Sequence, residues 1–325
     1  MDRENPEEPA LKMKFYQEIR RFVTQAGFAC EETAVDGLMF LKTWNAAGET
    51  LYILPAAISA RSPEEAAEEY RKRSAAGKLL QGAAMAGLPD KTGGNAGTCG
   101  RNYSQAGTCV VTIAEDRWRK QNSLYRARVL SHLGKFRSIF ARNCSVERID
   151  RGTANRFMDA NHTYGASACR HCYGLTDRNS GMLVAAATFS NSRKWIKEGR
   201  EIRSYEWIRY ASASGTRIPG GMGKVLKKFM EDIRPDDIMS YADLEWSDGA
   251  VYRRLGFVED GQKEPVLFTI DPEDWSRKAF RQGHGTPQTG QPARILQPED
   301  FRTDGMLWYM NDGSLKYRLR LPARP

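Results

Sequence analysis

The chain has 325 residues, of which 41% are hydrophobic, so it can bury a sizeable core and has room for two domains and tails. It contains no run of about 18 apolar residues and starts with a polar, acidic segment, so we expect no membrane span, no secretory signal and a cytoplasmic location. The formal net charge of +9 favours a polyanionic partner.

Residues 1–143 are expected to form a first domain. Apolar residues at helical spacing predict a helix over 11–28. A second helix is predicted over 62–81, because Ser62 can cap it, Pro63 can begin it and glutamates fill its first turn. The remaining expectations are strands at 37–44, 50–58 and 108–118 and a surface loop at 87–100.

The segment from Arg117 to Arg142 contains Lys and Arg throughout and no carboxylate. On a helix these side chains would form a positive face, with Trp118 and Tyr125 among its apolar or stacking groups. Such a helix either turns its charges to water or contacts phosphates, and the absence of a compensating acid favours phosphates. The candidate DNA-binding residues are Arg117, Arg119, Lys120, Arg126, Arg128, Lys135 and Arg137.

A second domain is expected over 144–271. Thr153 can cap a helix that delivers His162 and Tyr164 into a loop. A nearly continuous apolar strand is predicted at 182–190 and a last strand at 265–270. The strand at 201–212 should carry Arg203, Tyr205, Trp207 and Arg209 on one face, followed by a helix at 223–233, a strand at 236–246 and a short helix at 247–257.

Residues 272–325 read as a linker, at 281–294, and a small C-terminal extension.

Between the 201–212 strand and its helix stands "TRIPGGMGKVLKKFM". A dinucleotide-binding fingerprint would need glycine where Leu226 stands, and a P-loop would need Ser or Thr where Val225 stands. Glycines still allow a tight turn, and the free amides and dipole of the helix that follows can bind an anion. The alternative is a turn with only a structural role.

The stretch "SDGAVYRRLGF" resembles the closing motif of GCN5-related N-acetyltransferases, with Ala250, Tyr252, Leu255, Gly256 and Phe257 at the matching positions. The resemblance implies an α+β fold with a GNAT-like mixed sheet flanked by helices. It also implies acetyl-CoA or another acyl-CoA as the coenzyme, and Tyr252 as the group that protonates its thiolate. The matching coenzyme-binding residues are Arg217, Gly220, Gly221, Met222, Gly223 and Lys224, although the lysines of this helix can serve DNA instead.

Residues 112–257 also resemble a phage and prophage family in which a nuclease-like domain precedes a GCN5-type domain. The resemblance implies that the first domain is a degenerate restriction-endonuclease-like α/β domain, since Asp36 is the one acid that survives at its metal-binding positions. Similarity to Mom-type DNA modification domains implies an anti-restriction role in which an adenine amine is modified. The implied catalytic residues are His162, Tyr164, Arg209, Asp243 and Tyr252.

The chemistry of these residues is coherent. Asp243 or His162 can act as the base that an amine nucleophile needs, Tyr252 as the acid, and Arg209 can stabilise charge. A base in duplex DNA must be flipped out, and Tyr164, Trp207 or Trp246 can stack on it. The alternatives are a DNA-binding accessory protein without catalysis and an acetyltransferase acting on proteins or small molecules.

Cys169 and Cys172 form a single C-x-x-C pair with His171 between them. Such a pair can contribute to a zinc or iron site, but without a second pair we favour free thiols and assign no metal ligand. Six cysteines are too sparse for a disulfide scaffold. The sequence indicates no oligomeric state.

Overall fold

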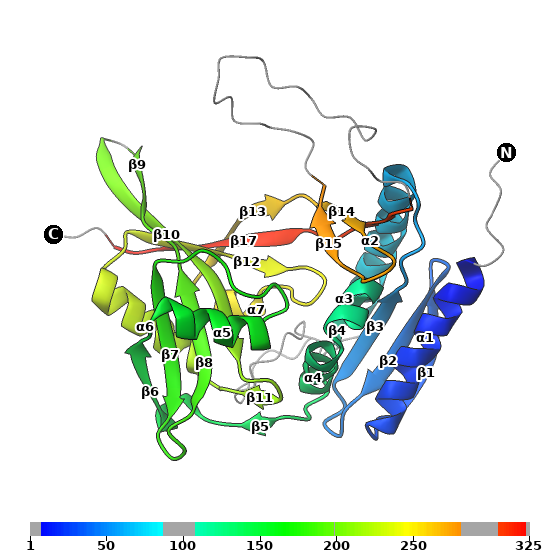
Figure 1. The fold of residues 1–325 in the computed structure, drawn as a ribbon, viewed down its shortest axis with the longest axis horizontal. Coiled ribbons are helices and arrows are strands. Elements are labelled where there is room, and N and C mark those ends of the chain that lie inside the picture. Colours follow the sequence, from blue (N-terminus) through cyan, green and yellow to red (C-terminus); the bar gives the residue numbers. More distant parts are fainter. Residues whose placement is uncertain (1–7, 87–107, 198, 281–304, 323–325) are drawn as a thin grey trace. The chain divides into compact units, whose positions relative to one another are not determined.

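The computed structural model describes residues 8–86, 108–197, 199–280 and 305–322 (Figure 1). The chain divides into two compact units: unit 1 holds Met1–Gly87, Thr108–Asn122 and Glu264–Gly313, and unit 2 holds Leu88–Gly107, Ser123–Lys263 and Ser314–Pro325. This division differs from the expected boundaries after residues 143 and 271, because the chain leaves unit 2 after Lys263 and returns to it at Ser314. The loop predicted at 87–100 and the linker predicted at 281–294 lie outside the described residues.

Unit 1 begins with a four-stranded sheet and two helices. The order of the strands is β1-β2-β3-β4, antiparallel except for the parallel pair β3 and β4. Phe40 and Leu54 of the sheet pack against Ala76 and Leu80 of the second helix. Both predicted helices and the first two strands are confirmed, whereas the 108–118 strand ends at Ala114. The elements are α1 (Glu8–Gln25), β1 (Cys30–Val35), β2 (Leu38–Trp44), β3 (Thr50–Ala56), α2 (Pro63–Ala86) and β4 (Thr108–Ala114).

Asp36, the candidate acid of the nuclease-like domain, lies in the turn between β1 and β2. Asp36 and Gly37 both have positive φ, 48° and 75°, and form the two-residue connection of this hairpin. Asp-Gly is typical of such turns because both central residues must adopt the left-handed conformation. Asp36 is exposed there, so turn geometry accounts for it without a metal.

Unit 1 also contains a three-stranded antiparallel sheet, ordered β15-β14-β16. Its strands are β14 (Leu267–Ile270), β15 (Arg277–Ala279) and β16 (Leu307–Met310). The last strand predicted for the second domain, at 265–270, is therefore part of unit 1, because β14 pairs with β15 and β16 rather than with the larger sheet.

A buried ion pair joins this sheet to α3 (Glu115–Lys120), which follows β4 directly. Arg277 Nε and Nη2 donate to the two carboxylate oxygens of Asp116 at 2.7 and 2.6 Å, and the two side chains are only 3% and 1% exposed. The Arg277 guanidinium also lies 4.7 Å from the ring centroids of Phe268 and Tyr309.

Unit 2 is built on a mixed sheet flanked by helices, as expected. The strand order is β13-β17-β12-β10-β8-β7-β6, in which β10 and β12 run parallel and the other pairs are antiparallel. β9 forms a hairpin with β10. The strands are β6 (Cys144–Arg148), β7 (His171–Asp177), β8 (Leu183–Phe189), β9 (Arg193–Lys197), β10 (Arg200–Ser212), β12 (Asp237–Asp243), β13 (Val258–Lys263) and β17 (Ser314–Arg320).

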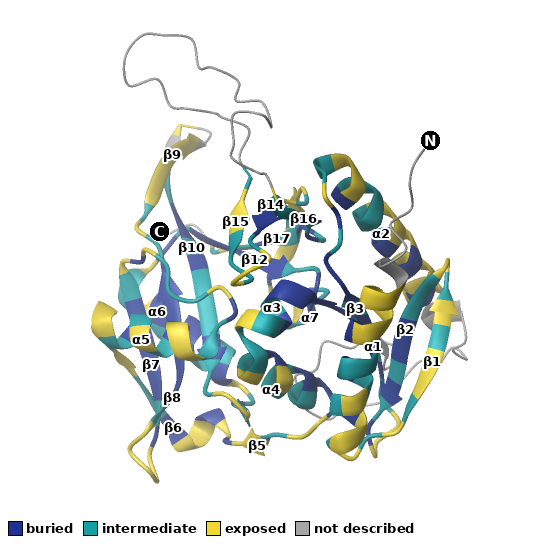
Figure 2. Cartoon of the chain, turned by 45° about the vertical axis from the view of Figure 1, so that its right-hand side comes forward, coloured by how far each residue is buried: buried dark blue, intermediate teal, exposed yellow. Residues whose placement is uncertain are grey.

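Two helices cover opposite faces of this sheet. α6 (Gly221–Ile233) packs on β6 and β7, where Phe229 stacks on Phe189 with ring centroids 3.8 Å apart. α5 (Arg151–Asn161) packs on β7, β8 and β10, where Met158 contacts Ala186 and Ala211. Figure 2 shows the buried strands of this sheet in dark blue. No helix among the described residues is long and apolar enough to cross a membrane.

The basic segment 117–142 is not one helix. It is divided among α3, α4 (Asn122–His132), β5 (Arg137–Ser138) and η1 (Ala141–Asn143). α4 ends because Gly134 adopts φ 83° and Lys135 N bonds back to Leu130 O at 2.8 Å, a glycine-dependent helix stop. α5 likewise starts earlier than predicted, since Asp150, not Thr153, is its cap and accepts from Thr153 N at 2.9 Å.

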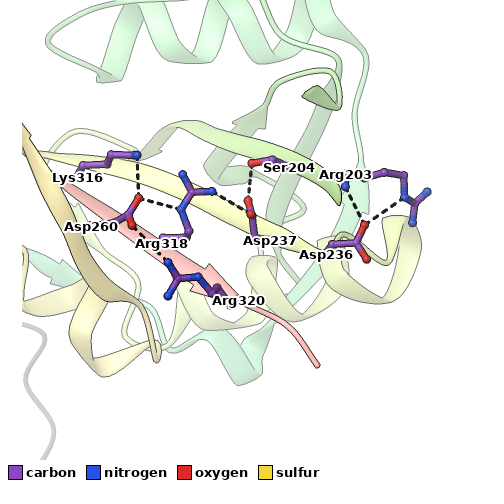
Figure 3. A network of polar contacts seen from close by, with 8 residues as sticks. All are labelled: Arg203, Ser204, Asp236, Asp237, Asp260, Lys316, Arg318 and Arg320. Carbon is purple, nitrogen blue, oxygen red and sulfur yellow. Dashed lines mark hydrogen bonds and ion pairs between the residues drawn. The ribbon is translucent and has the colours of Figure 1, made fainter. Parts of the chain in front are cut away.

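β17 comes from the segment that was expected to be a C-terminal extension, and charged side chains fix it between β12 and β13. Arg318 donates to Asp237 at 2.9 Å and to Asp260 at 2.8 Å, and Lys316 lies 2.7 Å from Asp260 (Figure 3). Arg320 adds a 3.6 Å contact to Asp260. The network therefore joins three adjacent strands.

Asp260→Asn is expected to lower the free energy of unfolding by about 1–2 kcal/mol at neutral pH. Hydrogen bonds from Lys316 and then Arg318 lower the pKa of Asp260 to about 2. A carboxyl group whose pKa is lower in the folded state contributes stability above its unfolded value, and loses it as the pH falls through the folded value. Urea unfolding should therefore show a larger difference between variant and wild type near pH 7 than near pH 3. Glu147→Gln, an exposed carboxylate on β6, is the control and should show neither effect.

Candidate active site

The parallel pairing of β10 and β12 is short. Ser204–Glu206 pairs with Asp237–Met239, and no further pair between the two strands is formed in the described part of the chain. Ser240 Oγ donates to Trp207 O at 2.9 Å directly beyond the last pair. We call Trp207–Ser212 together with Ser240–Asp243 the fork, because backbone groups of β10 that face β12 there have no ladder partner.

A bulge interrupts β10 within the fork. The register with β8 shifts between Trp207 and Arg209, so the predicted alternation from Arg203 to Arg209 on one face is broken. Trp207 is buried in the core, whereas Arg209 is half-buried. A bulge re-aims side chains in this way, so Arg209 does not follow the face of Trp207.

The glycine turn leads from the short strand β11 (Thr216–Arg217) into α6. Gly220 has φ 79°, and the first intrahelical bond runs from Lys224 N to Gly220 O at 3.0 Å. The amides of Met222 and Gly223 precede that bond and therefore have no carbonyl one turn back to bind. The turn thus presents amides and the positive end of the helix dipole, the arrangement that binds anions.

Gly221 is held against β10 with no room for a side chain. A Cβ there would lie 2.4 Å from Tyr210 Oη and 2.9 Å from Ile218 Cγ2. Tyr210 Oη is itself buried without a hydrogen-bond partner among the described residues. The absence of a side chain at Gly221 therefore sets the position of the start of α6 on the sheet.

Gly221→Ala is expected to lower the free energy of unfolding by about 1–3 kcal/mol, because overpacking forces the turn away from Tyr210. Gly77→Ala, in α2, is the matched control, since a Cβ there meets nothing within 4 Å. That control should be neutral or stabilising by up to about 1 kcal/mol, because alanine favours a helix interior. Equal urea midpoints for the two variants would show that the contact with Tyr210 is not tight.

Two of the predicted coenzyme-binding side chains have other partners. Lys224 Nζ donates to Ala141 O at 2.8 Å and to Cys144 O. The Arg217 guanidinium lies 4.8 Å from the ring centroid of Phe136. These contacts hold the segment before β6 against the start of α6, so the anion-binding capacity of the turn depends on its backbone.

The structure brings together four of the five predicted catalytic residues. Tyr164 Oη donates to Asp243 Oδ2 at 3.1 Å, and the Arg209 guanidinium lies 5.6 Å from the Tyr164 ring centroid. His162 Nδ1 accepts from Tyr164 N at 3.1 Å. The end of α5, the bulge of β10 and the end of β12 thus contribute one polar cluster at the fork.

The imidazole of His162 is neutral at physiological pH. Burial, with the charges of Arg209 and Arg128, lowers the pKa of His162 to about 3. Because Nδ1 accepts a backbone hydrogen bond, the proton of the neutral ring is on Nε2. Asp243 is therefore the better base of the two that the sequence left open.

One N–H group of the Arg209 guanidinium makes no hydrogen bond among the described residues. Its Nη1 donates to Ile208 O at 2.9 Å, while its Nε is buried without a hydrogen-bond partner among the described residues. Thr188 Oγ1, at the paired position on β8, is also buried and unpartnered within that part of the chain. Burial lowers the pKa of Arg209. Buried donors without partners are costly, so a bound group that accepts from Nε would be stabilised here.

Tyr252, the fifth predicted residue, lies on α7 (Ala250–Arg254) and reaches the fork through Ser240. Its Oη is 2.8 Å from Ser240 Oγ and donates to Tyr241 O at 3.3 Å, and its ring stacks on Tyr317 at 5.3 Å. Sequence reasoning missed Ser240 and Tyr317. Ser240 is one small residue within a buried strand, and Tyr317 joins the site only because β17 pairs with β12.

Two predicted stacking residues are part of the core. Trp207 and Trp246 are almost completely buried, and Trp246 packs against Tyr125, with ring centroids 5.3 Å apart, and under the Arg128 guanidinium at 4.2 Å. Tyr164 is 37% exposed, so it is the one of the three that can stack on a bound base without rearrangement of the core.

Several predicted DNA-binding cations are paired inside the chain. Arg119 bonds to Glu18 and Glu115, Lys120 Nζ lies 2.8 Å from Asp274, and Arg128 covers Trp246. Glu115 stands just before this segment, whereas Glu18 and Asp274 are distant in sequence, and the local sequence does not reveal their pairing with it. Arg117 is half-buried, Lys120 is exposed although paired with Asp274, and the other exposed members of the set are Arg126, Lys135 and Arg137.

Cys169 and Cys172 form a buried thiol pair. Their sulfur atoms are 3.4 Å apart, and burial, followed by the hydrogen bond with Cys169, raises the pKa of Cys172 to about 12. Cys172 is thus a protonated thiol at neutral pH. Among the residues that the structure describes, no group of three or more His, Cys, Asp or Glu side chains is arranged to hold a metal ion.

Comparisons with known proteins gave matches among solved structures only. No protein-family model and no curated protein matches the sequence. The chain is similar to the NatC complex bound to Gag peptide and CoA, at 11% identity over 55% of this chain and 99% of that chain, with a TM-score of 0.31. It is also similar to the ribosomal-protein-S5-alanine acetyltransferase from Vibrio fischeri, at 12% identity over 56% and 96%, with a TM-score of 0.34. A third similar structure is yncA, a putative acetyltransferase from Salmonella typhimurium with its cofactor acetyl-CoA, at 11% identity over 56% and 96%, with a TM-score of 0.31.

Proposed function

We propose that unit 2 is an acyl-CoA-dependent N-acyltransferase of the GCN5-related type. The observation that carries the proposal is the fork, where the β10–β12 ladder ends beside the glycine turn and the cluster around Asp243. The elements have the order that the resemblance predicts. The strand β10 is followed along the chain by the glycine turn, α6, β12, α7 and the Gly256–Phe257 turn.

The residues of the glycine turn and of the fork fit an acyl-CoA. The amides of Met222 and Gly223 and the dipole of α6 suit its pyrophosphate. Beyond Glu206, β10 forms no ladder with β12 among the described residues, and backbone groups at such a sheet edge can bind a chain that carries amides, as they bind an added strand. When bound, the coenzyme supplies an acyl group activated as a thioester.

The polar cluster supplies the other groups that transfer to an amine needs. Asp243 accepts the proton of the attacking amine, and Tyr164 holds the carboxylate in place through Oδ2. Arg209 stabilises negative charge with its unpartnered Nε. Tyr252 donates a proton to the leaving sulfur.

Release of free thiol from acetyl-CoA, followed in the presence of a panel of amines that includes DNA, nucleosides, polyamines and peptides, tests this proposal. We expect amine-dependent release by the purified chain. A folded chain that binds acetyl-CoA but releases thiol with no member of the panel would instead be an accessory binding protein.

For the acceptor we propose an exocyclic amine of a DNA base, in a phage or prophage anti-restriction role. The net charge of +9, the exposed cations Arg126, Lys135 and Arg137, and the exposed ring of Tyr164 beside Asp243 support this choice. DNA from bacteria that express the chain, digested to nucleosides, should contain a mass-shifted base that Asp243→Asn removes. Unmodified DNA together with transfer to a peptide or polyamine would assign a different acceptor.

For unit 1 we propose a nuclease-like domain that is retained for binding or packing. Asp36 is a turn residue, and Lys42, the lysine of β2, lies 3.4 Å from Glu31 on the neighbouring strand. Clustered carboxylates are needed to hold catalytic metal ions, and β2 and β3 carry none. Magnesium-dependent cleavage of DNA by the purified chain would contradict this.

A further inference from the structure

A buried serine lies where β10 and β12 stop pairing. Ser240 is 2% exposed, and its Oγ lies 2.9 Å from Trp207 O and 2.8 Å from Tyr252 Oη. The single hydroxyl hydrogen of Ser240 is shared between two acceptors that lie within its reach, Trp207 O and Tyr252 Oη. Because the Tyr252 hydroxyl donates to Tyr241 O at 3.3 Å, Ser240 is the donor toward the phenol, and the oxygens form a chain into the fork.

Ser240 is the one side chain among the described residues that makes a hydrogen bond to the Tyr252 hydroxyl. The other contacts of the phenol are the Tyr241 carbonyl, at 3.3 Å, and the rings of Tyr317, Phe257 and Trp207. Burial raises the pKa of Tyr252, whereas the hydrogen bond with Ser240 and the charge of Arg209 act in the opposite direction. A buried phenol needs such groups if it is to release its proton.

We propose that Ser240 is a positioning residue for proton release by Tyr252: it orients the phenol in the fork and donates to the phenolate oxygen once the proton has left. This inference rests on the proposed acyltransferase function. In the step, the Tyr252 O–H bond breaks and the proton forms the S–H bond of the leaving thiol. The Ser240 hydroxyl donates to the phenolate, and a proton from water then restores the phenol.

The kinetic test is a double-mutant cycle between Ser240 and Tyr252. Ser240→Ala is expected to lower kcat about 10- to 100-fold, since it removes a hydrogen bond to a developing charge, with KM for acetyl-CoA unchanged. Ser240→Thr, which keeps the hydroxyl, should restore most of the rate. In a Tyr252→Phe background, Ser240→Ala should cost nothing further, because the phenol through which it acts is gone. An equal loss in both backgrounds would overturn the proposal and make Ser240 a packing residue.

A second test does not depend on enzymatic activity. The titration of Tyr252 is followed by NMR on protein labelled at the tyrosine ring carbon, and Tyr252→Phe assigns the signal. Ser240→Ala should move the midpoint of Tyr252 to higher pH, because a hydrogen bond that favours the phenolate is lost. An unmoved midpoint in a folded Ser240→Ala chain contradicts the role of Ser240. Absence of acyl transfer by the wild-type chain contradicts the proposed function instead, so the two failures are distinguishable.

Discussion

Asp243→Asn is expected to lower kcat for acyl transfer by about 100- to 10,000-fold, the range found when a general base is removed. The asparagine side chain keeps the size of aspartate and an oxygen that can accept from Tyr164 Oη, so the cluster should stay assembled. It cannot take a proton from an attacking amine. Initial rates of thiol release at saturating acetyl-CoA measure the loss, and the affinity for acetyl-CoA should be unchanged.

Glu231→Gln is the matched control, since it makes the same change of charge on α6 at an exposed residue that only approaches Lys227, at 3.9 Å. It should keep the wild-type rate. Because His162 is neutral with its proton on Nε2, the cluster holds no second base ready to replace Asp243. If the rate of Asp243→Asn were close to that of the control, another group would have to act as the base, and the role assigned to the cluster would be wrong.

Arg277→Ala is expected to lower the free energy of unfolding of unit 1 by about 3–5 kcal/mol, because it leaves the buried carboxylate of Asp116 without its partner. The stacking of the guanidinium between Phe268 and Tyr309 is lost as well. Urea unfolding measures the change, and hydrogen exchange at 267–270 and 307–310 shows whether the three-stranded sheet opens.

The double variant Arg277→Met with Asp116→Leu separates charge from volume. Apolar residues of similar size often replace a buried ion pair without loss of stability, so the double variant should regain most of what Arg277→Ala loses. A double variant as unstable as the single one would mean that packing around Phe268, rather than the unpaired charge, decides the stability of this sheet.

The sequence predicted those parts of the fold that local patterns determine. The spacing of Val225, Leu226 and Phe229 places one apolar stripe on α6, and that stripe is buried. β17 was not predicted as a strand of the main sheet, because about 50 residues of unit 1 separate it from β13 and nothing local indicates its partner. The pairing of Arg318 with Asp237 and Asp260 shows that the information lies in contacts between distant residues.

The candidate site was likewise predicted only in part from the sequence. Tyr164, Arg209 and Asp243 were proposed from a resemblance, and in the structure Tyr164 lies next to both Asp243 and Arg209. The hydrogen-bond partners of individual side chains could not be predicted from the sequence. The position of Lys224 after a glycine turn predicts a phosphate ligand, yet its ammonium group donates to two backbone carbonyls. The bulge after Trp207 likewise has no signal in the alternation of the strand.

Calorimetric titration of acetyl-CoA into the purified wild-type chain tests the central claim most directly, because that claim is that the fork and the glycine turn hold an acyl-CoA. We predict binding at one site per chain that pyrophosphate weakens by competition, since the amides of Met222 and Gly223 bind the same group in both. A folded chain that gives no binding signal with acetyl-CoA would contradict the account.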